Sequence, residues 1–160
     1  MTEHTYKQFD IELENIRTRV LQMGGLVEQQ IIKAMEGLQS GDMLLIDQVI
    51  NNDTRVNASE VSLDETCSQI IARRQPAAVD LRLVMMVIKT ITDLERVGDE
   101  AKKIAKLAKQ VHAAHAGLVP RVELRHCADL AVAMLRQALD AFARLDLNAA
   151  ADVVRQDKQV

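Results

Sequence analysis

The sequence predicts an all-α protein: an elongated three-helix bundle followed by the first part of a second, repeated bundle. Three observations support this fold class. Apolar residues make up 48% of the 160 residues but aromatic residues only 2%, so the core must be built from aliphatic side chains, which favour helix here. Apolar residues recur in steps of three and four, which is the spacing of one helix face. Four residues mark short breaks between long periodic segments: Gly41, Pro76, Gly117 and Pro120.

The first helix is predicted from about Tyr6 to Leu38. Its apolar stripe consists of Phe9, Leu13, Ile16, Val20, Met23, Val27, Ile31, Ala34 and Leu38. Gly24 and Gly25 interrupt it. Because two glycines together cost about 2 kcal/mol of helix propensity, we expect close helix packing or a bend there. Ser40-Gly41 ends the helix, since Gly is common just beyond a helix C-terminus.

The second helix is predicted from Asp42, as N-cap, to about Arg74. An apolar residue recurs every seven positions, as in a coiled-coil-like bundle: Val49, Val56, Leu63 and Ile70. Arg73, Arg74 and Arg82 flank the break at Pro76. They could receive an acidic partner, but helix capping and a salt bridge to Asp80 are the simpler interpretation.

The third helix is predicted from Pro76 to about His115, because Pro is tolerated in a first helical turn. The apolar run from Leu83 to Ile88 marks this helix as the most buried. Three helices of this length with short connections must pack antiparallel, each about 45–60 Å long. A fourth helix is predicted from about Pro120 to Leu145, and a fifth from about Asn148 onward. Residues 1–116 then form the first bundle, and residues 117–160 an incomplete second repeat.

An internal repeat underlies this division. A shift of 104 residues aligns Ala34 with Ala138, Asp42 with Asp146, Val49 with Val153, Asp53 with Asp157 and Val56 with Val160. The second copy thus lacks most of its second helix and all of its third. An uncovered apolar face costs about 25 cal/mol per Å². We therefore expect residues 145–160 to swap with another chain, to pack on the first bundle, or to be poorly ordered.

One polar constellation could carry chemistry. Asp53, Asn57, Glu60 and Asp64 are spaced four, three and four residues apart, so they share one face of the second helix. Glu95 and Asp99 share a face of the third helix, and antiparallel packing brings the pairs Glu60/Asp64 and Glu95/Asp99 close. Oxygen donors without His or Cys suit Mg, Ca, Mn or ferric iron. The alternative is a solvated acidic face neutralised by Arg96, Lys102 and Lys103.

Other features exclude several functions. The net charge of -3 argues against nucleic-acid binding. No signal-peptide core and no membrane-length apolar run is visible. Cys67 and Cys127 fit reduced core thiols of a cytoplasmic protein. His112 and His115 fit a solvated helix end better than a metal site. No phosphate-binding Gly loop, catalytic triad or zinc spacing is present, so we expect no enzyme.

Three stretches resemble the PhoU family of phosphate-signalling regulators: FDIELENIRTRVLQMGGLV (9–27), RRQPAAVDLRLVM (73–85) and DLERVGDEAKKIA (93–105). The resemblance covers essentially the whole chain. It implies two tandem three-helix bundles, of which the second is truncated here. Its Glu/Asp-x-x-x-Asp motif, which holds metal clusters in some members, matches Glu60–Asp64 and Glu95–Asp99. Asp53 and Asn57 are secondary candidates, and the metal would be Fe, Mn, Mg, Ca or Zn.

The resemblance also implies a function. Family members repress phosphate uptake and the phosphate-starvation response. They act as adaptors between the ATPase subunit of a phosphate ABC transporter and a PhoR-type sensor histidine kinase. We therefore expect a cytoplasmic protein, peripheral to the inner face of the membrane through its partners. We also expect a homo-oligomer, formed as a homodimer by swapping of the C-terminal helices. The alternative function is a carboxylate-ligated metal-binding or metal-storage protein.

Overall fold

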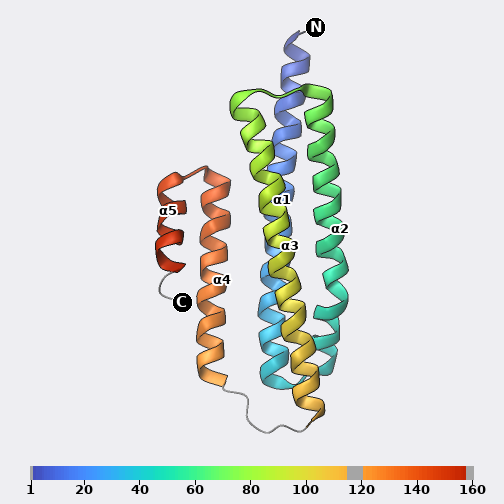
Figure 1. Cartoon of the computed structure of the whole chain (residues 1–160), viewed down its shortest axis with the longest axis vertical. Helices are drawn as coiled ribbons and strands as arrows, with labels where there is room; N and C mark the ends of the chain where they lie inside the picture. The colour runs from blue at the N-terminus through green and yellow to red at the C-terminus, as the bar shows by residue number, and fades with distance from the viewer. Residues whose placement is uncertain (1, 115–120, 158–160) are drawn as a thin grey trace.

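The computed structural model describes residues 2–114 and 121–157, with side chains described for 7–114 and 123–157. In these ranges the chain forms five helices and no strand: α1 (Thr2–Ser40), α2 (Met43–Arg74), α3 (Ala78–Ala113), α4 (Arg121–Arg144) and α5 (Leu147–Gln156). Helices α1, α2 and α3 form an antiparallel three-helix bundle, and α4 and α5 lie along one side of it (Figure 1). The all-α prediction is confirmed. The boundary after residue 116 and the predicted end at His115 fall outside the described residues.

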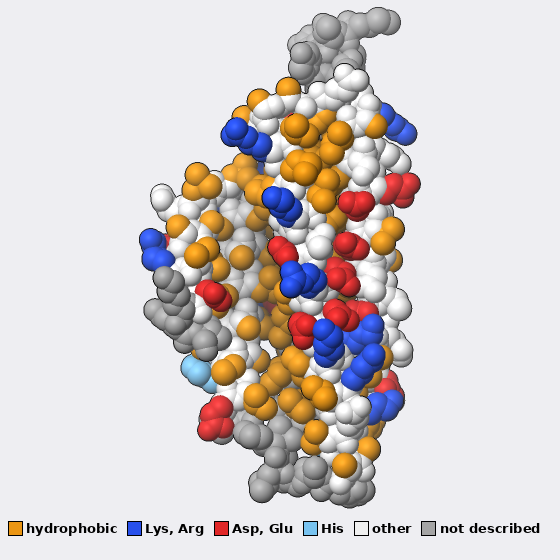
Figure 2. Space-filling view, in the orientation of Figure 1, with side chains coloured by type: hydrophobic (Ala, Val, Ile, Leu, Met, Phe, Trp, Pro, Cys, Tyr) orange, Lys and Arg blue, Asp and Glu red, His pale blue; other side chains and the backbone are white. Residues whose placement is uncertain are grey.

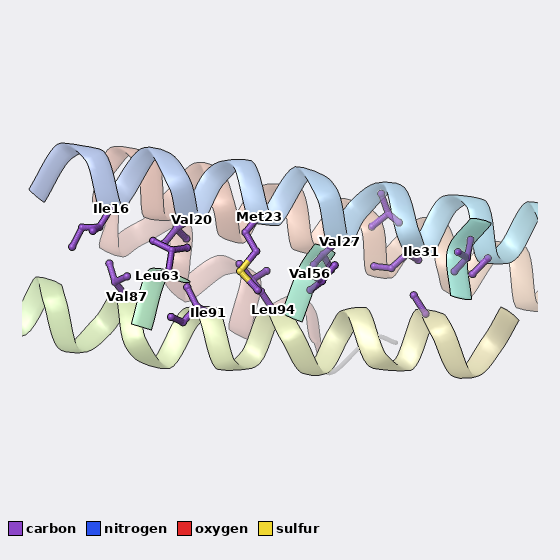
Figure 3. Packing of buried hydrophobic residues seen from close by; sticks show 14 of the residues in the cluster. Ile16, Val20, Met23, Val27, Ile31, Val56, Leu63, Val87, Ile91 and Leu94 are labelled. Atoms are coloured by element: carbon purple, nitrogen blue, oxygen red, sulfur yellow. The ribbon is translucent and has the colours of Figure 1, made fainter. Parts of the chain in front are cut away.

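The core lies along the axis of the three-helix bundle. Ile16, Val20, Met23 and Val27 of α1 point toward α3, where Val87 and Ile91 meet them (Figure 3). Helix α2 contributes the predicted seven-residue stripe, and all four of its members are buried: Val49, Val56, Leu63 and Ile70. The aliphatic stripes read from the sequence are therefore the core that holds α1, α2 and α3 together.

The ends of α2 follow from local side-chain and backbone chemistry. Asp42 is the N-cap, and its Oδ1 accepts hydrogen bonds from the backbone N–H groups of Leu44 (2.9 Å) and Leu45 (3.2 Å). At the other end Gln75 takes a left-handed conformation with φ 49° and closes the helix. Arg74 donates to both carboxylate oxygens of Glu12 on α1, at 2.9 and 2.7 Å, which lowers the pKa of Glu12. The Arg74 contact thus crosses to α1 and is not the predicted bridge to Asp80.

Helix α3 begins at Ala78, two residues after Pro76. Its N-terminal apolar run is less buried than predicted. Val84 and Val87 are buried, but Met85 and Met86 are 44% and 37% exposed. The run is longer than one helix face, so it cannot all turn inward.

Helix α4 packs on α1 where α1 carries its glycine pair. A Cβ atom at Gly24 would lie 2.6 Å from Cδ1 and Cδ2 of Leu139. At Gly25 a Cβ atom would meet nothing within 4 Å. Arg136 of α4 adds an ion pair to Glu28 of α1, at 2.6 Å. The expected close helix packing is confirmed at Gly24, and α1 continues as one helix through both glycines.

The loop before α5 repeats the loop before α2. Asp146 caps α5 through hydrogen bonds from Asn148 and Ala149, as Asp42 caps α2. The preceding residues, Gly41 and Leu145, are both left-handed, with φ 73° and 53°. Helix α5 folds back on α4, and none of its described residues is buried (Figure 1). Helix α5 thus packs mainly on α4 rather than on the first bundle, and the expected exchange with another chain stays a prediction.

The two cysteines differ in environment. Cys67 is buried, and burial raises the pKa of its thiol to about 11, with a smaller contribution from the charge of Asp64. Cys127 is exposed, so the prediction of a core thiol is wrong there. The helical pattern placed Cys127 on α4, but in the described part of α4 the buried residues are Val132 and Ala141. Within the described ranges, no helix combines the length and the apolar character that a membrane crossing requires.

Candidate carboxylate site between α2 and α3

The predicted acidic residues lie on the neighbouring helices α2 and α3. We call the following six residues the carboxylate band: Asp53, Asn57, Glu60 and Asp64 of α2, and Glu95 and Asp99 of α3. The pKa of Glu60 is raised, first by burial and then by the negative charges of Glu95 and Asp64. Glu95 is on the other helix, so antiparallel packing brings the two motifs within electrostatic reach, as predicted.

Asp53 is the buried end of the band. It is only 1% exposed, and its Oδ2 accepts a hydrogen bond from Nζ of Lys102 on α3, at 2.6 Å. That hydrogen bond is the main reason why the pKa of Lys102 is raised, and the charges of Asp53, Asp99 and Glu95 add to it. The pair therefore joins α2 to α3 beside the core, with the Lys102 side chain 26% exposed and the Asp53 side chain enclosed.

Two oxygen atoms of the band have no hydrogen-bond partner among the described residues. They are Oδ1 of Asp53 and Oδ1 of Asn57, and both are fully buried. Unpaired buried acceptors cost about 1–3 kcal/mol each. The two residues are four apart on α2, so they lie one helical turn from each other. They mark the place in the band where a further positive group would be most stabilising.

A second lysine compensates one more carboxylate of the band, Asp99. Lys103 lies 3.1 Å from Oδ2 of Asp99 and 2.8 Å from Oε1 of Glu100. Arg96 pairs with Asp93, at 3.5 Å, which is not a member of the band. Figure 2 shows acidic and basic side chains mixed in one region midway along this face, with hydrophobic side chains above and below it. The predicted neutralisation by Lys102 and Lys103 is therefore present, whereas Arg96 is engaged elsewhere.

The donor chemistry of the band fits a hard cation, but its geometry does not. The band supplies carboxylate and amide oxygens only. Over the described parts of the chain, however, no three or more His, Cys, Asp or Glu side chains converge in a way that could hold a metal ion. As arranged here, the band is a row of salt-bridged and partly uncompensated carboxylates.

Two contacts of the band did not follow from spacing alone. The sequence indicated that Lys102 neutralises the acidic face, but not that its partner is Asp53, which falls in the buried stripe, four residues after Val49 and three before Val56. A carboxylate in that stripe needs a cation from the facing helix. Gly98 was quoted only as part of a motif. A Cβ atom there would lie 3.1 Å from Cγ1 of Val56, so this glycine lets α3 approach α2 closely.

The family model of the PhoU domain matches residues 20–108, which include every residue of the band. The chain belongs to the PhoU family. A PhoU from Serratia marcescens, the phosphate-specific transport system accessory protein, is 49% identical over 160 residues, covering 100% of this chain and 65% of that protein. The protein of the same name from Escherichia coli (strain K12) is 45% identical over 161 residues, covering 100% and 66%. This chain thus spans about two thirds of the length of these PhoU relatives.

Solved PhoU structures agree with the fold. The crystal structure of PhoU from Pseudomonas aeruginosa superposes with a TM-score of 0.90 at 44% identity, covering 94% of this chain and 72% of that one. The phosphate transport system regulatory protein PhoU from Streptococcus pneumoniae gives 0.87 at 30% identity, covering 94% and 70%. The helical arrangement is therefore that of PhoU proteins along nearly the whole chain.

Proposed function

We propose that this protein is a non-enzymatic regulator of phosphate transport. It represses phosphate uptake and the phosphate-starvation response as an adaptor between the ATPase subunit of a phosphate ABC transporter and a PhoR-type sensor histidine kinase. It works at the cytoplasmic face of the membrane through these partners. The observation that carries the proposal is that relatives 45–49% identical to the full chain are named accessory proteins of the phosphate-specific transport system.

The surface of α3 supports a docking role. A shallow groove of about 500 Å³ on this helix is lined by Leu81, Arg82, Met85, Met86, Lys89, Thr90 and Asp93. Flexible Met side chains adapt to a partner surface, and the cations at the rim can meet acidic groups. Exposed apolar groups of this kind, rimmed by polar ones, are typical of interaction sites.

Deletion of the chromosomal gene tests the proposal. We expect phosphate-starvation genes to be expressed constitutively in phosphate-rich medium, and the wild-type gene to restore repression. A Met85→Asp plus Met86→Asp variant should fail to restore it and should lose the ATPase or the kinase in pull-downs. Leu124→Asp, which changes a similarly exposed residue on α4, is the matched control and should restore repression. Normal repression in the deletion strain would refute the proposal.

A second candidate function is cation binding by the carboxylate band. Glu60, Asp64, Glu95 and Asp99 would hold the ion, with Asp53 and Asn57 as secondary ligands. Two observations favour it: the unpaired buried oxygens of Asp53 and Asn57, and the raised pKa of Glu60. A bound Fe, Mn, Mg, Ca or Zn ion would compensate these charges once the side chains converge.

Metal analysis after gentle purification tests this candidate, with Glu95→Ala plus Asp99→Ala as the variant. We expect stoichiometric metal in the wild type and none in the variant. Metal-free protein at every pH would reject cation binding and leave the adaptor proposal intact. If the Met85→Asp plus Met86→Asp variant loses repression but keeps the metal content of the wild type, the adaptor surface and the carboxylate band act independently.

We also propose that the chain forms homo-oligomers, as homodimers, by exchanging its C-terminal helices. The support is that α5 packs on α4 while Leu147 and Val154 are 84% and 69% exposed. Light scattering should give a dimer mass for the wild type and a monomer mass for a Leu147→Asp plus Val154→Asp variant. A monomer at all concentrations would reject the exchange.

A further inference from the structure

A second polar groove lies between α1 and α2, on the other side of α2 from the carboxylate band. It has a volume of about 620 Å³, and its polar lining is Arg19, Gln22 and Gln29 of α1 with Arg55, Ser59 and Ser62 of α2. At 100° per residue, the α2 members lie about 180–240° around the helix from Asp53. The groove is therefore independent of the carboxylate band.

The two arginines of this groove differ from most others in the chain. Arg17, Arg74, Arg96, Arg136, Arg144 and Arg155 each pair with a carboxylate. Arg19 instead donates to two hydroxyls, Oγ1 of Thr66 at 2.9 Å and Oγ of Ser62 at 2.8 Å. Arg55 has no carboxylate partner among the described residues. Two guanidinium charges in one groove are thus left uncompensated.

Among the residues that the structure describes, the lining contains no Asp or Glu, in a chain whose net charge is -3. The hydroxyls hold the Arg19 guanidinium in place without neutralising it, so it is pre-organised for an incoming anion. Ser and Gln side chains around it can donate further hydrogen bonds. In the carboxylate band, by contrast, lysines pair with the carboxylates of Asp53 and Asp99.

The charge, the volume and the apolar lining of the groove limit which class of ligand it could bind. Arg19 and Arg55 together supply two positive charges, which match the roughly two negative charges of a phosphate ester at pH 7. Guanidinium groups bind phosphate oxygens in a bidentate fork. The volume falls within the roughly 300–1,000 Å³ of small-molecule sites and exceeds what a free oxyanion fills. Met23, Leu26 and Leu63 add an apolar floor, and the open space at Gly25 keeps the groove accessible.

We propose that the α1–α2 groove binds a small phosphate ester of the nucleotide class. Its phosphate group would lie between Arg19 and Arg55, and its organic part on the apolar floor. This inference rests on the groove alone and not on the function proposed above. Inorganic phosphate offers the same oxyanion chemistry without the organic part, so the experiment uses both ligands.

Isothermal titration of the full chain with AMP, and separately with inorganic phosphate, tests the proposal at about 0.15 M salt, where non-specific attraction is screened. Arg55→Gln is the main variant, because the Arg55 side chain has no ion pair with any described residue, so its loss should not disturb folding. Arg82→Gln is the matched control, since it removes the same charge from α3 outside the groove. Circular dichroism confirms that both variants are folded.

We expect AMP to bind the wild type, at least tenfold more weakly to Arg55→Gln, and within twofold of the wild type to Arg82→Gln. If inorganic phosphate binds more weakly than AMP, with the same dependence on Arg55, this would support a contact between the organic part of AMP and the apolar floor. Equal binding of both ligands would keep the oxyanion site and overturn the nucleotide assignment. No binding of either ligand at millimolar concentration, or equal losses in both variants, would overturn the whole proposal.

Discussion

The adjacent glycines of α1 give the sharpest test of how α4 packs. A Cβ atom at Gly24 would lie 2.6 Å from two methyl carbons of Leu139, whereas at Gly25 it would meet nothing within 4 Å. The same substitution, Gly→Ala, therefore probes two neighbouring positions that differ mainly in their contact with α4. Both lie well inside a continuous helix, so their helix-propensity terms are nearly equal.

The two substitutions are expected to change the stability of the fold in opposite directions. Gly25→Ala should stabilise the fold by about 0.8–1 kcal/mol, which is the propensity difference between Ala and Gly. Gly24→Ala gains the same amount, but the contact at 2.6 Å is far inside the roughly 3.5–4.0 Å of favourable carbon contacts. Overpacking costs about 1–3 kcal/mol. Gly24→Ala should thus be less stable than Gly25→Ala by about 1–3 kcal/mol.

Urea denaturation followed by circular dichroism measures both variants, and thermal unfolding should separate them by about 2–4 °C per kcal/mol. Repeating Gly24→Ala in a Leu139→Ala background completes a double-mutant cycle. There the clash is gone, so the substitution should stabilise by about 0.8–1 kcal/mol. If Gly24→Ala stabilises the wild type as much as Gly25→Ala does, then α4 does not pack on α1 at this point and the reasoning is wrong.

Three further predictions concern charge and backbone strain. Lys102→Met leaves the Asp53 carboxylate buried without its cation, so the free energy of unfolding measured in urea should fall by about 2–4 kcal/mol. Adding Asp53→Leu should restore the lost stability. An unchanged free energy of unfolding in Lys102→Met would contradict the buried ion pair. Because the pKa of Glu60 is raised, its contribution to stability is present below its unfolded pKa and is lost as pH rises through its folded pKa. Glu60→Gln should therefore stabilise by about 0.5 kcal/mol at pH 7 but not near pH 3.5, and equal effects at both pH values would contradict this. Leu145→Gly should relieve the strain of a left-handed non-glycine residue and slow amide hydrogen exchange in α5 by about fivefold. Gly41→Ala, at the equivalent position before α2, should introduce that strain and destabilise α2. Faster exchange in Leu145→Gly would contradict the equivalence of the two loops.

Much of the fold was predictable from local pattern. The seven-residue stripe of α2 and the three- and four-residue steps of α1 identified the core, because burial of an aliphatic helix face repeats at the helical period. The Asp42 cap and the matching Asp146 cap were predictable because an N-cap bond is made within three residues. Such features depend only on neighbours in the sequence.

The candidate site was predictable in its membership and only partly in its arrangement. Spacing placed Glu60 and Glu95 on facing helices, and the raised pKa of Glu60 agrees with that. Spacing could not show that Lys102 would reach Asp53. Nor could it show that one carboxylate oxygen and one carboxamide oxygen would be left without a hydrogen bond among the described residues. These outcomes depend on the stagger between α2 and α3, which the close approach at Gly98 helps to set.

The sequence by itself determined the helices, their caps, their core faces and the repeat, since each follows from short-range spacing and backbone preference. Only the tertiary structure decided that α4 packs on α1 beside Gly24, that α5 folds onto α4, and that Cys127 faces solvent. It also placed Arg19 and Arg55 in one groove whose lining, among the described residues, has no carboxylate. The physical reason is that an amphipathic helix specifies which face is buried but not which neighbour covers it.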